Sequence, residues 1–178
     1  MSVEIATFAG GCFWCIEAAF NQLRGVQSAV SGYMGGQTDQ PTYRDICTGQ
    51  TGHAEVVQLH YDSTIINFEQ LLEVFFYLHN PTQLNRQGND VGTQYRSAIF
   101  FHQPEQQQQS QNYCQQLRQN GVYDQPIVTE ITAASQFFPA EDYHQGYVWQ
   151  NPQQPYCQFL IAPKLATFNK KYAAWLKS

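Results

Sequence analysis

Gly10-Gly11-Cys12-Phe13-Trp14-Cys15 joins two segments with different hydrophobic patterns. Residues 3–9 read as a strand, and residues 12–24 place apolar side chains at helical spacing before Gly25. The pattern predicts a strand, a glycine turn and a helix, with Cys12 at the helix N-terminus. Unpaired backbone N–H groups and the helix dipole favour a thiolate there, so we expect Cys12 to have a lowered pKa and to act as a nucleophile.

The Cys12-x-x-Cys15 spacing is compatible with redox chemistry, with metal binding and with simple packing of small apolar side chains. Its position at a strand-to-helix junction favours the redox interpretation. Structural zinc usually takes four protein ligands. The sequence contains no second Cys-x-x-Cys pair and no pair of closely spaced histidines that would complete such a set. We therefore expect no metal site.

Composition and charge indicate a globular protein and argue against several classes. The chain has 178 residues, 43% of them hydrophobic, which suits one core, so we predict a single domain over residues 1–178. A net charge of −5 gives a phosphate backbone little attraction, and we expect no nucleic-acid partner. No run approaches the ~20 apolar residues of a membrane span, and no signal-like segment opens the chain. Together with five scattered cysteines, this predicts a cytoplasmic protein with reduced thiols and no membrane contact.

The remaining periodicity predicts a mixed architecture. Alternating apolar residues indicate strands at residues 26–33, 54–61, 97–101 and 127–132. Helical spacing indicates a helix capped by Asn67, then helices over 104–120 and 141–148 and one near the C-terminus. Residues 35–52 and 80–95 read as long loops, and Cys157 as part of an irregular tail. The order β-α-β-β-α-β predicts an α+β protein, a ferredoxin-like split β-α-β two-layer sandwich with extra C-terminal segments.

Glu55 falls on the apolar side of the strand predicted at residues 54–61. The two-residue period of a strand puts it on one face with Val57, Leu59 and Tyr61. Burial on that face would raise the pKa of the carboxyl group and keep it protonated near neutral pH. The alternative is a glutamate at the strand end that faces solvent or pairs with an arginine such as Arg44 or Arg96.

Short motifs follow one another along nearly the whole chain. They are Gly11-Cys12-Phe13-Trp14, Pro41-Thr42-Tyr43-Arg44, Thr51-Gly52-His53-Ala54-Glu55, Arg86-Gln87-Gly88-Asn89-Asp90, Gly92-Thr93-Gln94-Tyr95-Arg96-Ser97, Ala140-Glu141-Asp142-Tyr143-His144-Gln145, and Asn151-Pro152 through Tyr156-Cys157. In this order and spacing they closely resemble the motifs of the peptide methionine sulfoxide reductase A family.

The resemblance implies an enzyme that reduces the S epimer of methionine sulfoxide, free or in proteins, to methionine. Cys12 resembles the nucleophile that attacks the sulfoxide sulfur. Glu55 resembles the acid that protonates the sulfoxide oxygen, which leaves poorly without a proton. The inward position of Glu55 on its strand gives a physical reason for that carboxyl group to hold a proton at pH 7.

The resemblance also assigns the rest of the site. Tyr43 and Tyr95 match the hydroxyl groups that hydrogen-bond the sulfoxide oxygen, and Asp90 matches a carboxylate that supports the polar side of the site. Phe13 and Trp14 match the pocket for the substrate methyl group, where burial contributes about 0.8 kcal/mol per methylene equivalent.

Attack on the sulfoxide would leave Cys12 as a sulfenic acid, which condenses readily with a second thiol. Cys157, in a C-terminal segment of residues 150–178, resembles the family's resolving cysteine, and Cys15 is the alternative. We favour Cys157, because a flexible tail reaches Cys12 with less strain than a bond within one helical turn. The resemblance implies thioredoxin as the reductant, oxidised proteins and free methionine sulfoxide as substrates, and neither a metal nor an organic cofactor. We expect a monomer.

Two rival functions differ in what they require of these residues. A general disulfide oxidoreductase would use Cys12 and Cys15 within a thioredoxin-like βαβ unit, but this pair comes early for such a unit and leaves the long loops without a role. A non-catalytic binding module would use Trp14, Tyr43 and Tyr95 to enclose a methylated or sulfur-containing side chain. It would keep its function without Cys12.

Overall fold

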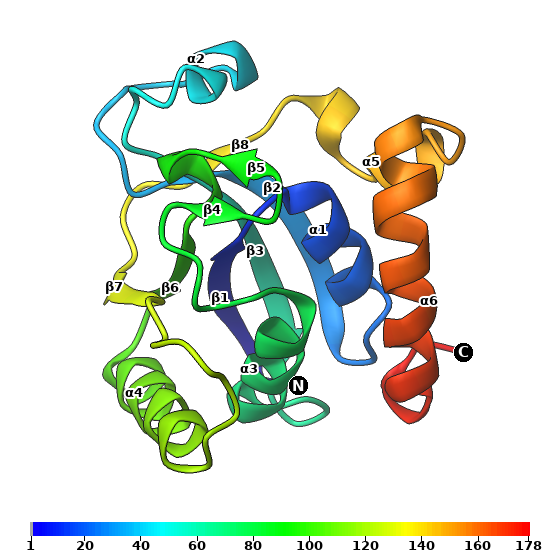
Figure 1. The fold of residues 1–178 in the computed structure, drawn as a ribbon. Coiled ribbons are helices and arrows are strands. Elements are labelled where there is room, and N and C mark those ends of the chain that lie inside the picture. Colours follow the sequence, from blue (N-terminus) through cyan, green and yellow to red (C-terminus); the bar gives the residue numbers. More distant parts are fainter. Residues whose placement is uncertain (1) are drawn as a thin grey trace.

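The computed structural model describes residues 2–178, and a six-stranded sheet forms its centre (Figure 1). In spatial order the strands are β7 (Glu130–Ala133), β6 (Ser97–Phe101), β1 (Val3–Gly10), β3 (Ala54–Asp62), β2 (Val26–Met34) and β8 (Phe138–Pro139). Neighbouring strands are antiparallel, except for β6 and β7, which are parallel. The inner order β6-β1-β3-β2 is that of the predicted split β-α-β sandwich, and β7 and β8 extend its two edges.

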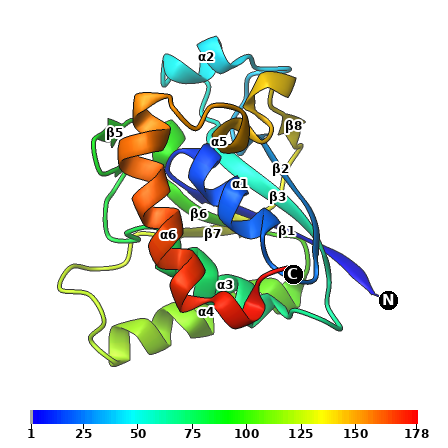
Figure 2. The same cartoon turned by 90° about the vertical axis from the view of Figure 1, so that its right-hand side faces the viewer.

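Helices α1 (Phe13–Asn21) and α3 (Phe68–Leu78) connect these inner strands and cover one face of the sheet. Figure 2 shows α6 (Ala162–Lys171) lying beside α1 on that same face. The main core fills the space between these layers. Phe8 of β1, for example, stacks on Phe20 of α1 at 5.6 Å and on Phe75 of α3 at 4.8 Å between ring centroids. A smaller apolar cluster lies on the opposite face, so the central strands are buried on both sides.

Shorter elements occupy the two segments that we predicted to be loops. Residues 35–52 contain α2 (Tyr43–Cys47), which Thr42 and Asp45 start with a reciprocal capping box. Residues 80–95 contain the hairpin of β4 (Arg86–Gln87) and β5 (Asp90–Val91), followed by a 3₁₀ turn at Thr93–Tyr95. These elements are too short to leave a hydrophobic period in the sequence.

The longer predicted elements are confirmed, with shifts at their ends. The four inner strands end within one residue of the predicted bounds, and α4 (Pro104–Gln119) lies where the glutamine-rich helix was predicted. Asn67 caps α3 through a capping box with Gln70. β7 begins three residues later than predicted, because the N–H of Val128 bonds the C=O of Pro81 before the strand starts. The predicted helix over 141–148 is instead a 3₁₀ turn at Asp142–His144 followed by α5 (Tyr147–Gln150).

The prediction of an irregular tail around Cys157 is wrong. Cys157–Ile161 is a π-helical turn that continues into α6, and only 1% of Cys157 is exposed. Two prolines are compatible with this helix. Pro155 lies in the first helical turn, where no intrahelical N–H bond is lost, and the wider π turn ends two residues before Pro163. Flexibility, the reason for favouring Cys157 as the resolving cysteine, therefore has no support in this ordered helix.

Candidate active site

Cys12 is the N-cap residue of α1, at the point where β1 ends. The turn between them depends on Gly11, whose φ of +95° lies in the left-handed region. A Cβ atom on Gly11 would also approach the Gln87 side chain within 2.7 Å. The side chain of Cys12 makes no capping hydrogen bond, but the backbone N–H of Trp14, in the first turn of α1, lies near enough to favour its thiolate. The predicted strand, glycine turn and helix therefore place Cys12 at a helix N-terminus.

The pKa of the Cys12 thiol is nevertheless raised well above its ordinary value, so our prediction of a lowered pKa is wrong. Burial of the sulfur is the largest cause, and the negative charge of Glu55 is the second. The N–H of Trp14 lowers the pKa but does not outweigh them. Because protonation of Glu55 removes the second cause, a proton on that carboxyl group favours ionisation of the thiol.

Glu55, near the start of β3, is buried with 2% of its surface exposed. One carboxylate oxygen, Oε1, accepts the N–H of Phe13 at 3.2 Å and so lies at the N-terminus of α1. Burial raises the pKa of Glu55 to about 8; the charge of Asp90 adds to the rise, and the bond from Phe13 opposes it. The predicted inward position is confirmed. Arg96, one of the alternative partners, pairs instead with Glu130 at 3.3 Å.

Tyr43 and Tyr95 approach the same site from different loops. Tyr43 opens α2, and Tyr95 closes the 3₁₀ turn after β5. Burial raises the pKa of both phenols, and the charges of Glu55 and Cys12 raise it further. Both hydroxyl groups therefore remain protonated, available as hydrogen-bond donors to a ligand beside Cys12 and Glu55.

Glu141 fixes the start of α2. One of its oxygens, Oε2, accepts the N–H of Tyr43 at 2.9 Å, and Oε1 accepts the hydroxyl of Tyr33 at 3.0 Å. The pKa of Glu141 is lowered because these donors, with its own backbone N–H, outweigh the effect of burial. The carboxylate therefore stays charged and holds Tyr43 at the edge of the site.

An aromatic cluster forms an apolar wall next to Cys12. Phe13 is buried and stacks on Tyr43 at 6.5 Å between ring centroids. Trp14 stacks on Tyr147 at 3.8 Å with the planes only 7° apart, and its Nε1–H donates to Nδ1 of His144 at 2.9 Å. The two residues predicted to form a methyl pocket are thus fixed in orientation by the segment around α5.

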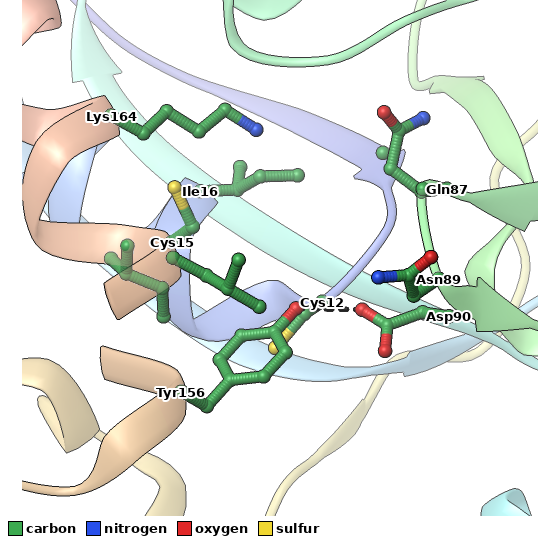
Figure 3. A pocket seen from close by; sticks show the side chains of 12 residues that line it. Cys12, Cys15, Ile16, Gln87, Asn89, Asp90, Tyr156 and Lys164 are labelled. Carbon is green, nitrogen blue, oxygen red and sulfur yellow. Dashed lines mark hydrogen bonds between the residues drawn. The ribbon is translucent and has the colours of Figure 1, made fainter. Parts of the chain in front are cut away.

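Asp90 and Tyr156 meet above Cys12, as Figure 3 shows. The hydroxyl of Tyr156 donates to Oδ2 of Asp90 at 2.6 Å and also contacts the sulfur of Cys12. Tyr156, Glu141 and His144 were not among the predicted site residues. All three lie within the motifs that carried the family resemblance, and that is the signal that could have found them.

A cavity of about 270 Å³ reaches Cys12 from the side of α6 (Figure 3). Its walls include Cys15, Gln87, Asp90, Tyr156 and Lys164. Glu55, Tyr43 and Tyr95 are not part of this lining, so the cavity approaches Cys12 from another direction. All five cysteines are free. Within residues 2–178, no three His, Cys, Asp or Glu side chains gather closely enough to hold a metal ion.

The family model for peptide methionine sulfoxide reductase matches residues 4–176. The chain belongs to this family. Among curated peptide methionine sulfoxide reductases named MsrA, that of Pasteurella multocida is 52% identical over 94% of this chain and 95% of its own. That of Chromobacterium violaceum is 52% identical over 99% of this chain and 100% of its own.

Solved structures of methionine sulfoxide reductases have the same fold. Methionine sulfoxide reductase A of Corynebacterium diphtheriae is 39% identical, with a TM-score of 0.75 over 85% of this chain and 76% of its own. Reduced Mxr1 from Saccharomyces cerevisiae is 33% identical, with a TM-score of 0.80 over 85% of this chain and 87% of its own. The family resemblance and the α+β fold that we predicted are therefore confirmed.

As a peptide methionine sulfoxide reductase, the chain is an oxidoreductase that reduces methionine sulfoxide. The site described above brings together the residues that the resemblance pointed to, with the exception of Cys157, which lies buried at the start of the π-helical turn. No helix within residues 2–178 is both long and apolar enough to cross a bilayer.

Proposed function

We propose that this reductase transfers the sulfoxide oxygen of methionine S-sulfoxide to Cys12, with Glu55 as the acid. The observation that carries the proposal is the buried Glu55 carboxyl group, with a pKa of about 8, beside the thiol at the N-terminus of α1. The Cys12 sulfur attacks the sulfoxide sulfur while Glu55 protonates the oxygen. The oxygen then passes to the Cys12 sulfur: its bond to the methionine sulfur and the bond between the two sulfurs break, a bond between the oxygen and the Cys12 sulfur forms, and methionine leaves Cys12 as a sulfenic acid. Glu55 recovers a proton from the original thiol, so the first step is balanced.

The other site residues would bind and orient the sulfoxide. Tyr43 and Tyr95, held protonated, donate hydrogen bonds to its oxygen. Asp90 holds Tyr156 over Cys12 and supports the polar side of the site. Phe13 and Trp14 enclose the methyl group, and an oriented methyl group next to an oriented oxygen accounts for a preference for one epimer.

A second cysteine, Cys15 or Cys157, then condenses with the sulfenic acid and releases water. Thioredoxin would reduce the resulting disulfide, a proposal supported by the solved complex of Mxr1 with Trx2, a chain of the same fold. The substrates would be oxidised proteins and free methionine sulfoxide, and the role repair after oxidation. We propose that residues 1–178 act as one catalytic domain, as a cytoplasmic monomer.

A single turnover without added reductant tests the chemistry. Methionine S-sulfoxide is mixed with the reduced protein, methionine is counted per protein molecule, and disulfides are mapped by mass spectrometry. We expect about one methionine and a disulfide that includes Cys12. Cys12→Ser should form no methionine, whereas Cys114→Ala, at a buried cysteine of α4, should behave like the native protein. Binding without any methionine would favour the binding module, and insulin reduction alone would favour a disulfide oxidoreductase.

A further inference from the structure

Lys164 is the one basic residue that lines the cavity beside Cys12 and Cys15 (Figure 3). It lies in the first turn of α6, directly after Pro163. The only ion pair among residues 2–178 joins Arg96 and Glu130, so Lys164 has no carboxylate partner in the described chain. The carboxylate that lines the cavity, Asp90, accepts a hydrogen bond from the hydroxyl of Tyr156. Lys164 thus brings an exposed ammonium group without a carboxylate partner to the rim of a cavity that is lined by two thiols.

Cys15 is buried, with 6% of its surface exposed. In Figure 3 its sulfur lies on the Lys164 side of the cavity, whereas the Cys12 sulfur lies beside Tyr156. The pKa of the Cys15 thiol is raised overall, chiefly by burial; the charge of Lys164 opposes this rise, and that of Cys157 adds to it. The lysine is thus the group that opposes burial at this thiol.

Cys157 lacks the features that would let it react first. It is 1% exposed and is held within the π-helical turn. It does not line the cavity that reaches Cys12, whereas Cys15 does. Burial raises the pKa of the Cys157 thiol, and no cation lowers it.

We propose that Lys164 favours ionisation of Cys15 for its attack on the sulfenic acid on Cys12, so that Lys164 is a positioning residue for the resolving step. The inference rests on the proposed function, because it requires a sulfenic acid at Cys12. The Cys15 thiolate turns toward Cys12 and forms a sulfur–sulfur bond, while the sulfur–oxygen bond of the sulfenic acid breaks. The leaving hydroxide takes up the proton that Cys15 had released and departs as water. Cys12 is reduced and Cys15 oxidised, to the level of a disulfide.

Rapid-quench single turnovers test this step separately from the first. Methionine formation reports the attack by Cys12, and acid-quenched, alkylated samples analysed by mass spectrometry report formation of the Cys12–Cys15 disulfide. Both rates are measured from pH 6 to pH 10 for the native protein, Lys164→Met and Lys164→Arg. Lys170→Met is the matched control, because Lys170 lies on the same helix, is exposed and does not line the cavity.

We expect Lys164→Met to form methionine at the native rate but to form the disulfide about three- to tenfold more slowly at pH 7, because an opposite charge nearby commonly shifts a pKa by about one unit. The pH dependence of disulfide formation should move to higher pH, and the rates should converge at alkaline pH. Lys164→Arg should restore most of the rate, and Lys170→Met should match the native protein.

Two results would overturn the inference while leaving the first step intact. One is an unchanged rate and pH profile of disulfide formation in Lys164→Met. The other is a first-formed disulfide between Cys12 and Cys157 in the native protein. Absence of methionine in every protein would instead refute the proposed function itself, so the two failures are distinguishable.

Discussion

At the scale of single residues, the proton on Glu55 decides whether the site is ready to react. We expect Glu55→Gln to slow methionine formation in a single turnover by about 10²–10⁴-fold, the usual contribution of a general acid. The native rate should also fall as pH rises above about 8, because Glu55 then loses its proton and its charge opposes the Cys12 thiolate. Sulfoxide binding, followed by equilibrium titration, should be retained. If the rate of methionine formation in Glu55→Gln falls at alkaline pH as it does in the native protein, the fall does not come from Glu55.

The same carboxyl group should cost the protein stability. Its pKa rises on folding from an ordinary value of 4.5 to about 8, so its contribution is least unfavourable below pH 4.5 and the folded state loses stability as pH rises between these values. Glu55→Gln removes the buried charge and keeps a group that accepts the N–H of Phe13. We expect it to raise the free energy of unfolding by roughly 2–4 kcal/mol at pH 9, with the difference vanishing near pH 4.

Denaturant titrations of both proteins at several pH values measure this difference. The matched control is Glu105→Gln, an exposed glutamate in the first turn of α4, which should change the free energy of unfolding little at either pH. A difference for Glu55→Gln that grows toward acid pH would contradict the pKa assignment.

The environment of a single residue could be predicted where a local sequence pattern determines it, and not where distant segments do. The burial of Glu55 followed from the two-residue period of a strand. The pKa of Cys12 did not follow from its helix position, because burial and a neighbouring carboxyl group depend on chain segments distant in sequence. Tyr156 was missed for the same reason, since its partners are Asp90 and Cys12.

At the scale of elements, the capping box of α3 stabilises a helix remote from the chemistry. Asn67 accepts the N–H of Gln70 at 2.8 Å, and the Gln70 side chain accepts the N–H of Asn67 at 2.9 Å. We expect Asn67→Ala to lower the free energy of unfolding by about 1 kcal/mol. Sulfoxide turnover should not change, because neither residue touches the site. Asn67→Asp, which keeps a capping oxygen, should stay close to the native stability.

Elements long enough to show a repeated hydrophobic period in the sequence were predicted well, and short elements were not. The four inner strands and α4 extend over enough residues for their pattern to be read, whereas the edge strand β8, with two residues, was not predicted. α2, the β4–β5 hairpin and the π-helical turn depend on capping, on tertiary hydrogen bonds and on the position of Pro163. Two of these elements carry Tyr43 and Asp90. Local sequence patterns therefore did not predict the secondary structure of the segments that build much of the site.

At the scale of the whole molecule, Glu17 joins the first helix to the distant segment that orients Trp14. Its carboxylate on α1 accepts the N–H of Gly146 at 2.9 and 3.1 Å and the hydroxyl of Ser31 at 3.3 Å. We expect Glu17→Ala to lower the free energy of unfolding by about 1.5–3 kcal/mol, because buried donors lose a carboxylate acceptor. Amide hydrogen exchange should accelerate from residue 144 to residue 151, next to Trp14.

Hydrogen exchange resolved by peptide, combined with denaturant titration, checks this effect. Glu4→Ala is a control on β1, where the residue is half-buried and pairs with Tyr61 of β3. Faster exchange spread evenly over the sheet would indicate general loss of stability and would contradict a specific role for Glu17.

The C-terminal part of the chain also returns to α1 at its far end. Arg24 donates its N–H to the C=O of Trp175, and Lys177 donates to the C=O of Gln22. Cys12 leaves the ribosome well before Tyr156, Lys164 and these anchoring residues are made. During translation the reactive thiol therefore sits on a helix that has not yet received its covering layer. The nascent chain cannot acquire its full complement of active-site groups until the segment that carries Tyr156 and Lys164 has been made, so its chemistry waits for that segment to fold against α1.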